Sequence, residues 1–199
     1  MKGLNYSNLK ELYNKMNYPF YEGFYNVNIF GFRNPALTVD EFNDIIGIAY
    51  NDAFGRAVCL IYEGTTKAGL YYLKNKLGNS KGTFILKEGY FKSCWAAGLH
   101  SGKYPALVQK GNPFIGYRDN DSDGQLDLEG ETFTDVTGLN FHTTSFINNK
   151  EKVGAYSAGC QVIKDDKDFL SCKAVIDRSL ELYGKSISYA LFNMKDFFN

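Results

Sequence analysis

Apolar residues in the first quarter of the chain recur with the spacing of an α-helix in two places. Over 7–16 they return every three or four residues, which predicts an amphipathic helix. A second helix is predicted over 39–50, because Thr38 and Glu41 fit a capping box and the apolar residues that follow share one helical face. The stretch 21–34 between them, rich in Gly, Asn and aromatic residues, indicates a loop or a short strand.

The middle of the chain has a different texture, with short apolar or alternating runs separated by Gly, Asn and Asp. Runs of this length between turn residues are typical of strands joined by hairpins and loops. Elements of this kind side by side in the sequence favour a β-rich region over a helical one. The pattern predicts strands over 57–62, 82–86, 105–109, 113–117 and 138–144.

The last fifty residues combine both patterns. An apolar-rich run at 153–163 precedes a helix predicted over 166–183, whose apolar stripe repeats every three to four residues and which ends at Gly184. Apolar and small polar residues then alternate over 186–193, as they do in a half-buried strand. Together with the earlier elements, this predicts a mainly β or α+β fold.

The chain has 199 residues, which suits a single domain over 1–199. Within it, the pattern separates a helical and loop portion, 1–56, from a β-rich portion, 57–199. Basic and acidic residues both number 22, so we expect no nucleic-acid partner, which would favour a basic excess. No apolar run reaches the ~18 residues of a membrane span, and the first residues lack an apolar leader segment. We therefore expect neither a membrane partner nor a signal peptide.

Two residues suited to covalent catalysis lie in the second half of the chain: His142 and, 18 residues later, Cys160. One strand, a loop and a return strand fit in this interval and would bring both side chains to one sheet edge. A thiol has a pKa of about 8.5, and a neighbouring imidazolium favours the thiolate and can later protonate a leaving amine. Gly159 would let the backbone approach a substrate, with nearby amide N–H groups facing a developing oxyanion. Ser157 would hydrogen-bond within the turn or help to hold the thiolate.

The sequence motifs around these residues resemble those of a known family. His142 followed by Ser157-Ala-Gly159-Cys160 is similar to the signature of the L,D-transpeptidases (YkuD-like proteins), a His followed some way later by Ser-x-Gly-Cys. About half of the chain also resembles a group of phage-encoded proteins of this kind. The matching words lie at 64–69, 98–104, 117–119, 139–142 and 157–162.

This resemblance implies a YkuD-like, β-rich catalytic domain in which Cys160 attacks a peptide carbonyl next to a D-centre of peptidoglycan and His142 acts as the base. The thioester acyl-enzyme would pass to an amine or to water, so transferase and hydrolase both stay open, and no cofactor is required. A protein of this kind without a signal peptide would lie in the host cytoplasm or be associated with the virion, and would act on the cell wall. The residues expected to contact the substrate are His100, Thr143, Tyr156 and Gln161.

Two positions depart from the family's pattern. The family usually has Gly directly after the His, where this chain has Thr143, and Arg two residues after the Cys, where this chain has Val162. Recognition of a substrate carboxylate would then differ, and hydrolysis fits a phage-encoded protein better than crosslinking of the wall. Two other hypotheses stay open. One is a non-catalytic phage structural or wall-binding protein with the same fold, and the other is a different Cys/His enzyme such as an amidase or deamidase.

The remaining cysteines, Cys59, Cys94 and Cys172, form no CxxC pair, and we expect them to be small buried apolar residues. His100 stands in a turn-like context, which suits either a loop histidine bonded to the backbone or a residue at the rim of the same cleft. Neither histidine has metal-ligand spacing to the other or to a cysteine, so a zinc site is not expected.

A run of aspartates matches the first part of a calcium-binding loop. Carboxylates stand at loop positions 1, 3, 5 and 9, and Gly124 at position 6 permits the sharp turn. The match ends at position 12, where Gly130 replaces the usual Glu. We keep two interpretations: a structural calcium ion that orders the loop leading to the His142 strand, and a hairpin turn rich in Asp and Asn. The carboxylates concerned belong to Asp119, Asp121, Asp123 and Asp127.

Overall fold

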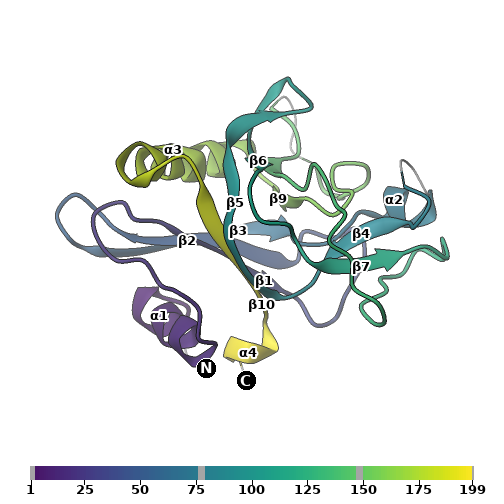
Figure 1. Ribbon diagram of the computed structural model, residues 1–199, viewed down its shortest axis with the longest axis horizontal. Helices are drawn as coiled ribbons and strands as arrows, with labels where there is room; N and C mark the ends of the chain where they lie inside the picture. Colours follow the sequence, from purple (N-terminus) through teal and green to yellow (C-terminus); the bar gives the residue numbers. More distant parts are fainter. Residues whose placement is uncertain (1–2, 76–78, 147–149, 199) are drawn as a thin grey trace.

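The computed structural model describes residues 3–75, 79–146 and 150–198. Eight of the strands in these ranges form one large sheet that closes into a barrel (Figure 1). The predicted mainly β or α+β class is therefore confirmed. In chain order the barrel strands are β1 (Asn28–Arg33), β2 (Asp44–Asn51), β3 (Ala57–Thr65), β5 (Gly89–His100), β6 (Tyr104–Gln109), β8 (Phe141–Thr143), β9 (Gln161–Ile163) and β10 (Ile187–Asn193).

Around the barrel the strands follow the order β1, β10, β5, β6, β8, β9, β3 and β2. Most neighbours are antiparallel, but β1 pairs in parallel with β10, and β8 pairs in parallel with β9. Two further strands, β4 (Thr83–Leu86) and β7 (Gly116–Asp119), form a separate antiparallel pair. This pair lies to one side of the barrel, next to the short helix α2 (Leu70–Lys74) (Figure 1).

Aromatic side chains fill the barrel interior and anchor the strand that carries His142. The fully buried ring of Trp95 packs against Phe141 and Tyr189, with centroid distances of 5.6 and 4.8 Å. Its indole N–H donates to the Leu139 carbonyl at 2.8 Å, so its only polar atom has a partner. Because side chains alternate along a strand, the inward-facing Phe141 leaves its neighbour His142 on the opposite face of β8.

Two long helices flank the sheet and confirm the predictions over 7–16 and 166–183. They are α1 (Tyr6–Lys15) and α3 (Asp166–Tyr183), and the chain also forms a short α4 (Lys195–Phe198). In the view of Figure 1, α3 lies above the sheet while α1 and α4 lie below it. Asp165 caps α3 by accepting hydrogen bonds from the first backbone N–H groups of the helix. The predicted stripe packs inward, because Phe169, Cys172 and Ile176 are buried in the main core.

The helix predicted over 39–50 is wrong, because this segment forms strand β2. Both edges of β2 are paired, with β1 on one side and β3 on the other. Its isoleucines pack in the core as branched side chains do on a pleated surface, and this tertiary pairing overrides the helical spacing. The expected cap does not form either: Leu37 and Asp40 have left-handed backbones, with φ of 53° and 67°.

The division between a helical portion at 1–56 and a β-rich portion at 57–199 is also wrong. Strands β1 and β2 belong to the first portion, yet they complete the barrel together with β10 and β3. The predicted strand over 186–193 is confirmed as β10, whereas β8 is shorter than the predicted 138–144, and β7 starts three residues later than the predicted 113–117. The long strand β5 was missed because its small residues break the alternation on which strand prediction relies.

Candidate active site

The parallel pairing of β8 and β9 brings His142 and Cys160 together. His142 is in register with Val162, and Cys160 immediately precedes β9. The backbone N–H of Asn140 points at the Cys160 sulfur, with an N···Sγ distance of 3.4 Å. A ring nitrogen of His142 and the sulfur lie within 4.8 Å of each other. The two side chains therefore meet as predicted, but between neighbouring strands of a closed barrel rather than at a sheet edge.

The turn that presents Cys160 explains why its local sequence is Ser-Ala-Gly-Cys. The Ser157 hydroxyl donates to the Cys160 carbonyl at 2.8 Å and accepts from the Gly159 N–H at 3.2 Å. Gly159 has φ of +113°, and a Cβ there would run into the carbonyl oxygen of Phe84. Ser157 therefore bonds within the turn. The Gly159 N–H is already used by this bond, so in this structure it does not face a substrate oxyanion as expected.

The loop that follows β3, the strand paired with β9, supports the same turn. The Gly69 N–H donates to the Ser157 carbonyl at 2.9 Å, and a Cβ at Gly69 would run into the carbonyl oxygen of Gly154. The close backbone approach requires glycine at position 69. The sequence motif at 64–69 is thus in direct contact with the motif that contains the cysteine.

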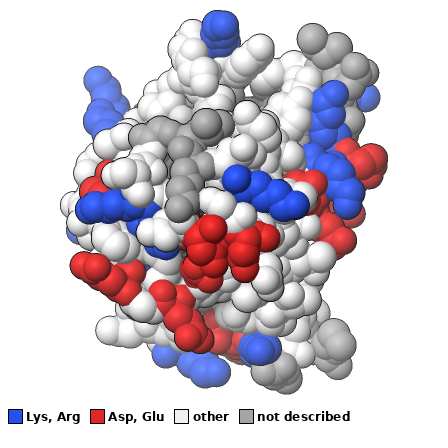
Figure 2. All heavy atoms as spheres, turned by 90° about the vertical axis from the view of Figure 1, so that its right-hand side faces the viewer, with Lys and Arg blue, Asp and Glu red and all other residues white. Residues whose placement is uncertain are grey.

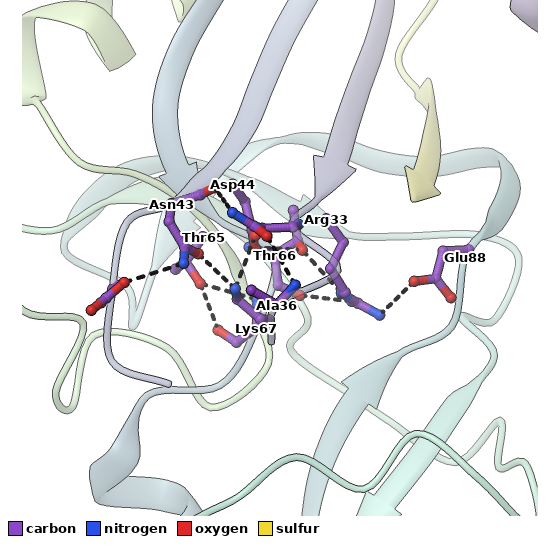
Figure 3. Close-up of polar contacts among 10 residues, drawn as sticks. Arg33, Ala36, Asn43, Asp44, Thr65, Thr66, Lys67 and Glu88 are labelled. Carbon is purple, nitrogen blue, oxygen red and sulfur yellow. Dashed lines mark hydrogen bonds and ion pairs between the residues drawn. The ribbon is translucent and has the colours of Figure 1, made fainter. Parts of the chain in front are cut away.

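Buried charges hold this loop in place at the ends of β1, β2 and β3 (Figure 3). The Asp44 carboxylate accepts from the Thr66 N–H at 2.7 Å and lies 3.0 Å from the Lys67 ammonium. The Arg33 guanidinium donates to the Thr66 carbonyl at 2.9 Å and pairs with Glu88. Because Arg33, Asp44 and Lys67 are at most 2% exposed, they need these partners to be tolerated in the interior.

The hydrogen bonds of His142 define which ring nitrogen carries its proton. Nδ1 lies 2.8 Å from the Thr143 carbonyl, which can only accept, so Nδ1 carries the hydrogen and Nε2 carries the lone pair. Nε2 is buried and has no hydrogen-bond partner in the described part of the chain. Burial and the neighbouring His100 lower the pKa of His142 to about 4, so the ring is neutral near pH 7.

His100, the last residue of β5, completes the cluster from a third strand. Its ring stacks on His142 with a centroid distance of 4.0 Å and an interplanar angle of 22°. Asn140 orients it: the side-chain oxygen accepts from the Gln109 N–H, which turns the amide nitrogen toward His100 Nδ1 at 3.1 Å. Burial lowers the pKa of His100 as well. His100 therefore lies in the cleft, and its contact with substrate stays a prediction.

The Cys160 thiol is neutral in this environment. Burial raises its pKa to about 11, although the Asn140 N–H that points at the sulfur favours the charged form. The expected thiolate beside an imidazolium is therefore corrected to a neutral thiol beside a neutral imidazole. In such a pair, proton transfer has to accompany attack rather than precede it.

A cavity of about 280 Å³ opens beside the stacked rings. The hydroxyl oxygen of Thr143 is buried and unpartnered in the described residues, on the same face of β8 as Phe141. Cys160 is 7% exposed and does not line the cavity, so the sulfur is reached only past the residues that cover it. The residues that line it include His100, Tyr104, His142, Thr143, Phe146 and Tyr156.

The four residues expected to contact the substrate do not all lie at the cavity. His100, Thr143 and Tyr156 line the cavity, as expected of residues that contact a substrate. Gln161 does not: it is fully buried, accepts from the Tyr189 hydroxyl at 2.7 Å and donates to the Gly159 carbonyl at 3.2 Å. Side chains alternate between the two faces of β9, and that of Gln161 falls on the face that points into the barrel.

Asn140 was missed by sequence reasoning, although it contacts both the sulfur and His100. The signal that could have found it is the two-residue period of a strand, which puts Asn140 and His142 on the same face of the sheet.

A metal ion is a chemical option for this cluster, since donor atoms of His100, His142 and Cys160 lie within 4.8 Å of one another. The three residues are widely separated in the sequence, but the fold brings them together. Zinc binds a histidine nitrogen at about 2.0–2.1 Å, close to the plane of the ring. Two rings stacked nearly parallel cannot both meet this condition for one ion, so the observed arrangement fits proton transfer better than metal binding.

Comparison with protein-family models, curated proteins and solved structures finds no match for this chain. None of the helices in the described ranges has the length and apolar character that a membrane crossing needs.

Proposed function

We propose that this protein is a cysteine-dependent acyl-transfer enzyme of the L,D-transpeptidase kind, which acts on peptidoglycan stem peptides through a thioester on Cys160. The proposal rests on two observations: a ring nitrogen of His142 lies within 4.8 Å of the Cys160 sulfur, and His142 Nε2 is buried and unpartnered in the described residues. A buried polar atom without a partner is costly, and such atoms are retained at sites where chemistry uses them.

The reaction starts from the neutral pair. As the sulfur attacks the peptide carbonyl, its proton passes to His142 Nε2, while the Thr143 carbonyl accepts from Nδ1–H and stabilises the imidazolium. The Asn140 N–H stabilises negative charge that develops on the sulfur. The imidazolium then protonates the leaving amine and the C–N bond breaks, which leaves a thioester. Water or an amine, deprotonated by His142, attacks the thioester and releases the thiol.

The surroundings of the cluster suit a short peptide. Tyr104, Phe146 and Tyr156 offer aromatic walls, and His100 offers a polar contact. Val162, where the family usually has arginine, is fully buried in an apolar cluster with Phe42 and Val153. A carboxylate of the substrate would therefore find no charge at position 162, so its recognition would differ from that of the family.

Defined muropeptides and mass spectrometry test this function. We expect products cleaved by water, with amine-exchanged products as a minor class. Cys160→Ala and His142→Ala should each lower product formation by roughly 100-fold or more, because one removes the nucleophile and the other its base. The matched control is Cys59→Ala, which removes a half-buried thiol of β3 and should keep full activity. Turnover that survives Cys160→Ala would rule out the mechanism.

A second candidate is a non-catalytic wall-binding or structural protein with this fold. The observation that favours it is the coverage of the sulfur, which is 7% exposed and lies outside the cavity lining. This candidate predicts that the protein sediments with insoluble peptidoglycan, that no cleaved product forms, and that Cys160→Ala binds as well as the unmodified chain. The first candidate predicts products that disappear with the same substitution.

A further inference from the structure

Asp119 carries a carboxylate oxygen whose partner is missing. It is the last residue of β7, where it pairs with Thr83, and it is only 2% exposed. One of its oxygens, Oδ2, accepts from the Asp127 N–H at 3.3 Å. The other, Oδ1, is buried without a hydrogen-bond partner in the described part of the chain. A covered carboxylate oxygen without a donor is costly unless a ligand completes it.

Two more carboxylates gather at the same point. Single oxygens of Asp119, Asp121 and Asp127 all lie within 4.8 Å of one another. Burial, and to a smaller degree the charges of Asp127 and Asp121, raise the pKa of Asp119 to about 6. Among the ion pairs of the described residues, none joins a lysine or arginine to these three side chains. The cluster therefore combines repulsion between like charges with an oxygen that lacks a partner.

The fourth aspartate of the run, Asp123, does not belong to this cluster. Asp123 accepts from the Gln125 backbone N–H at 2.7 Å and from its side-chain amide at 2.9 Å, so both its oxygens are used inside the turn. Glu129 and Glu131 are exposed and lie outside the cluster. Figure 2 shows the side of the molecule that carries β7 and α2, where acidic side chains gather with basic ones beside them.

We propose that Asp119, Asp121 and Asp127 bind one calcium ion at the end of β7. Calcium takes oxygen ligands at 2.3–2.6 Å, so two ligands of one ion lie at most about 5 Å apart, which agrees with the observed separations. Magnesium prefers a rigid octahedron with one or two carboxylates, so three carboxylates on an irregular loop favour the larger ion. The bound ion would complete Asp119 Oδ1 and tie the loop to the strand. This site is independent of the chemistry at Cys160.

The affinity should lie at the weak end of the range for protein calcium sites. The loop lacks the bidentate glutamate that closes a high-affinity site, since Gly130 stands at that position. A Kd of about 10⁻⁴ to 10⁻³ M is typical of sites with fewer ligands. Such a site is occupied where calcium is millimolar and empty where it is micromolar.

Isothermal titration calorimetry and thermal unfolding of the full chain test the site. After treatment with EDTA, the protein is titrated with CaCl₂ against NaCl of matched ionic strength. We expect saturable binding and a rise in Tm of about 3 to 5 °C at calcium tenfold above Kd, because a ligand that binds only the folded state stabilises it. No saturable binding, or an equal rise with MgCl₂, would overturn the proposal.

Substitutions within the loop separate the cluster from the sequence motif. Asp121→Asn and Asp127→Asn should each weaken calcium binding by roughly tenfold or more. Asp123→Asn removes a similar charge from the same turn but leaves the three ligands in place, so its Kd should stay within about threefold of the unmodified protein. Equal losses in Asp123→Asn and Asp121→Asn, or unchanged binding in Asp127→Asn, would contradict the assignment.

Discussion

At the scale of single residues, the chemistry open to Cys160 depends on the atoms around its sulfur. Cys160 and Cys59 form a natural comparison, because burial raises the pKa of both thiols to about 11. Of the two, Cys160 has a ring nitrogen of His142 within 4.8 Å in the described structure, and the Nε2 of that ring has no hydrogen-bond partner there. Any difference in reactivity between the two thiols beyond simple exposure would therefore report the base.

Alkylation with iodoacetamide at pH 7.5, followed by peptide mass spectrometry, measures this difference. We expect Cys160 to react roughly tenfold or more faster than Cys59, although Cys160 is the more buried of the two. In His142→Gln, a side chain of similar size that cannot take the proton, the advantage should disappear. The interpretation fails if both thiols react equally slowly in the unmodified chain, or if His142→Gln leaves the ratio unchanged.

The identities of His142 and Cys160 could be predicted from the sequence, because a His and a Ser-x-Gly-Cys word are local signals. The protonation states could not, since they follow from burial, and burial is produced by segments far apart in the chain. The same reason explains the outcome for Gln161, whose neighbours in the sequence indicate the site but whose side chain packs against Tyr189.

At the scale of elements, the short turn from Ser157 to Cys160 does more to build the site than either strand beside it. Its shape depends on Gly159, where a positive φ and contact with the Phe84 carbonyl leave no room for a side chain. The chain also has a glycine with positive φ and open space around it, Gly102 at the tip of the β5–β6 hairpin. Comparing substitutions at Gly159 and Gly102 separates the cost of a positive φ from the cost of steric exclusion.

We predict that Gly159→Ala destabilises the protein by about 2 to 4 kcal/mol and abolishes the fast alkylation of Cys160, because the turn has to move away from Phe84. Gly102→Ala should cost only about 1 kcal/mol and leave the alkylation rate unchanged. Urea unfolding monitored by fluorescence gives both free energies. Equal costs for the two substitutions would mean that the contact with Phe84 is unimportant.

Most elements could be predicted because their patterns are local. Apolar residues on one helical face marked α1 and α3, and alternation marked β10. Strand β2 could not be recognised, since its helical spacing was real and only its two partner strands override it. Short strands such as β8, with three residues, carry too little pattern for their ends to be located.

At the scale of the whole molecule, buried charges join the barrel to the candidate active site. Asp44 and Lys67 lie in segments that meet only when β2 and β3 pair, and the loop that carries Lys67 continues to Gly69 and the cysteine turn. Removing one member of such a pair leaves the other charge buried without compensation, which is far more costly than breaking an exposed pair.

Asp44→Ala is therefore expected to lower the free energy of unfolding by about 3 to 5 kcal/mol. The matched control is Glu181→Ala, which breaks the exposed pair with Arg178 on α3 and should cost no more than about 0.5 kcal/mol. Urea denaturation of the two variants under the same conditions makes the comparison. A cost for Asp44→Ala as small as that of the control would show that solvent replaces the lost partner.

The sequence by itself determined the mainly β or α+β class, the two long helices, the C-terminal strand, and the words in which His142 and Cys160 stand. These follow from periodicity and turn chemistry within a few neighbouring residues. Only the tertiary structure decided that 44–51 is a strand, that His100 stacks on His142, that the thiol and imidazole are neutral, and that Asp119, Asp121 and Asp127 converge without Asp123. Each of these depends on pairing or burial between segments that are far apart in the chain, and no local pattern encodes such contacts.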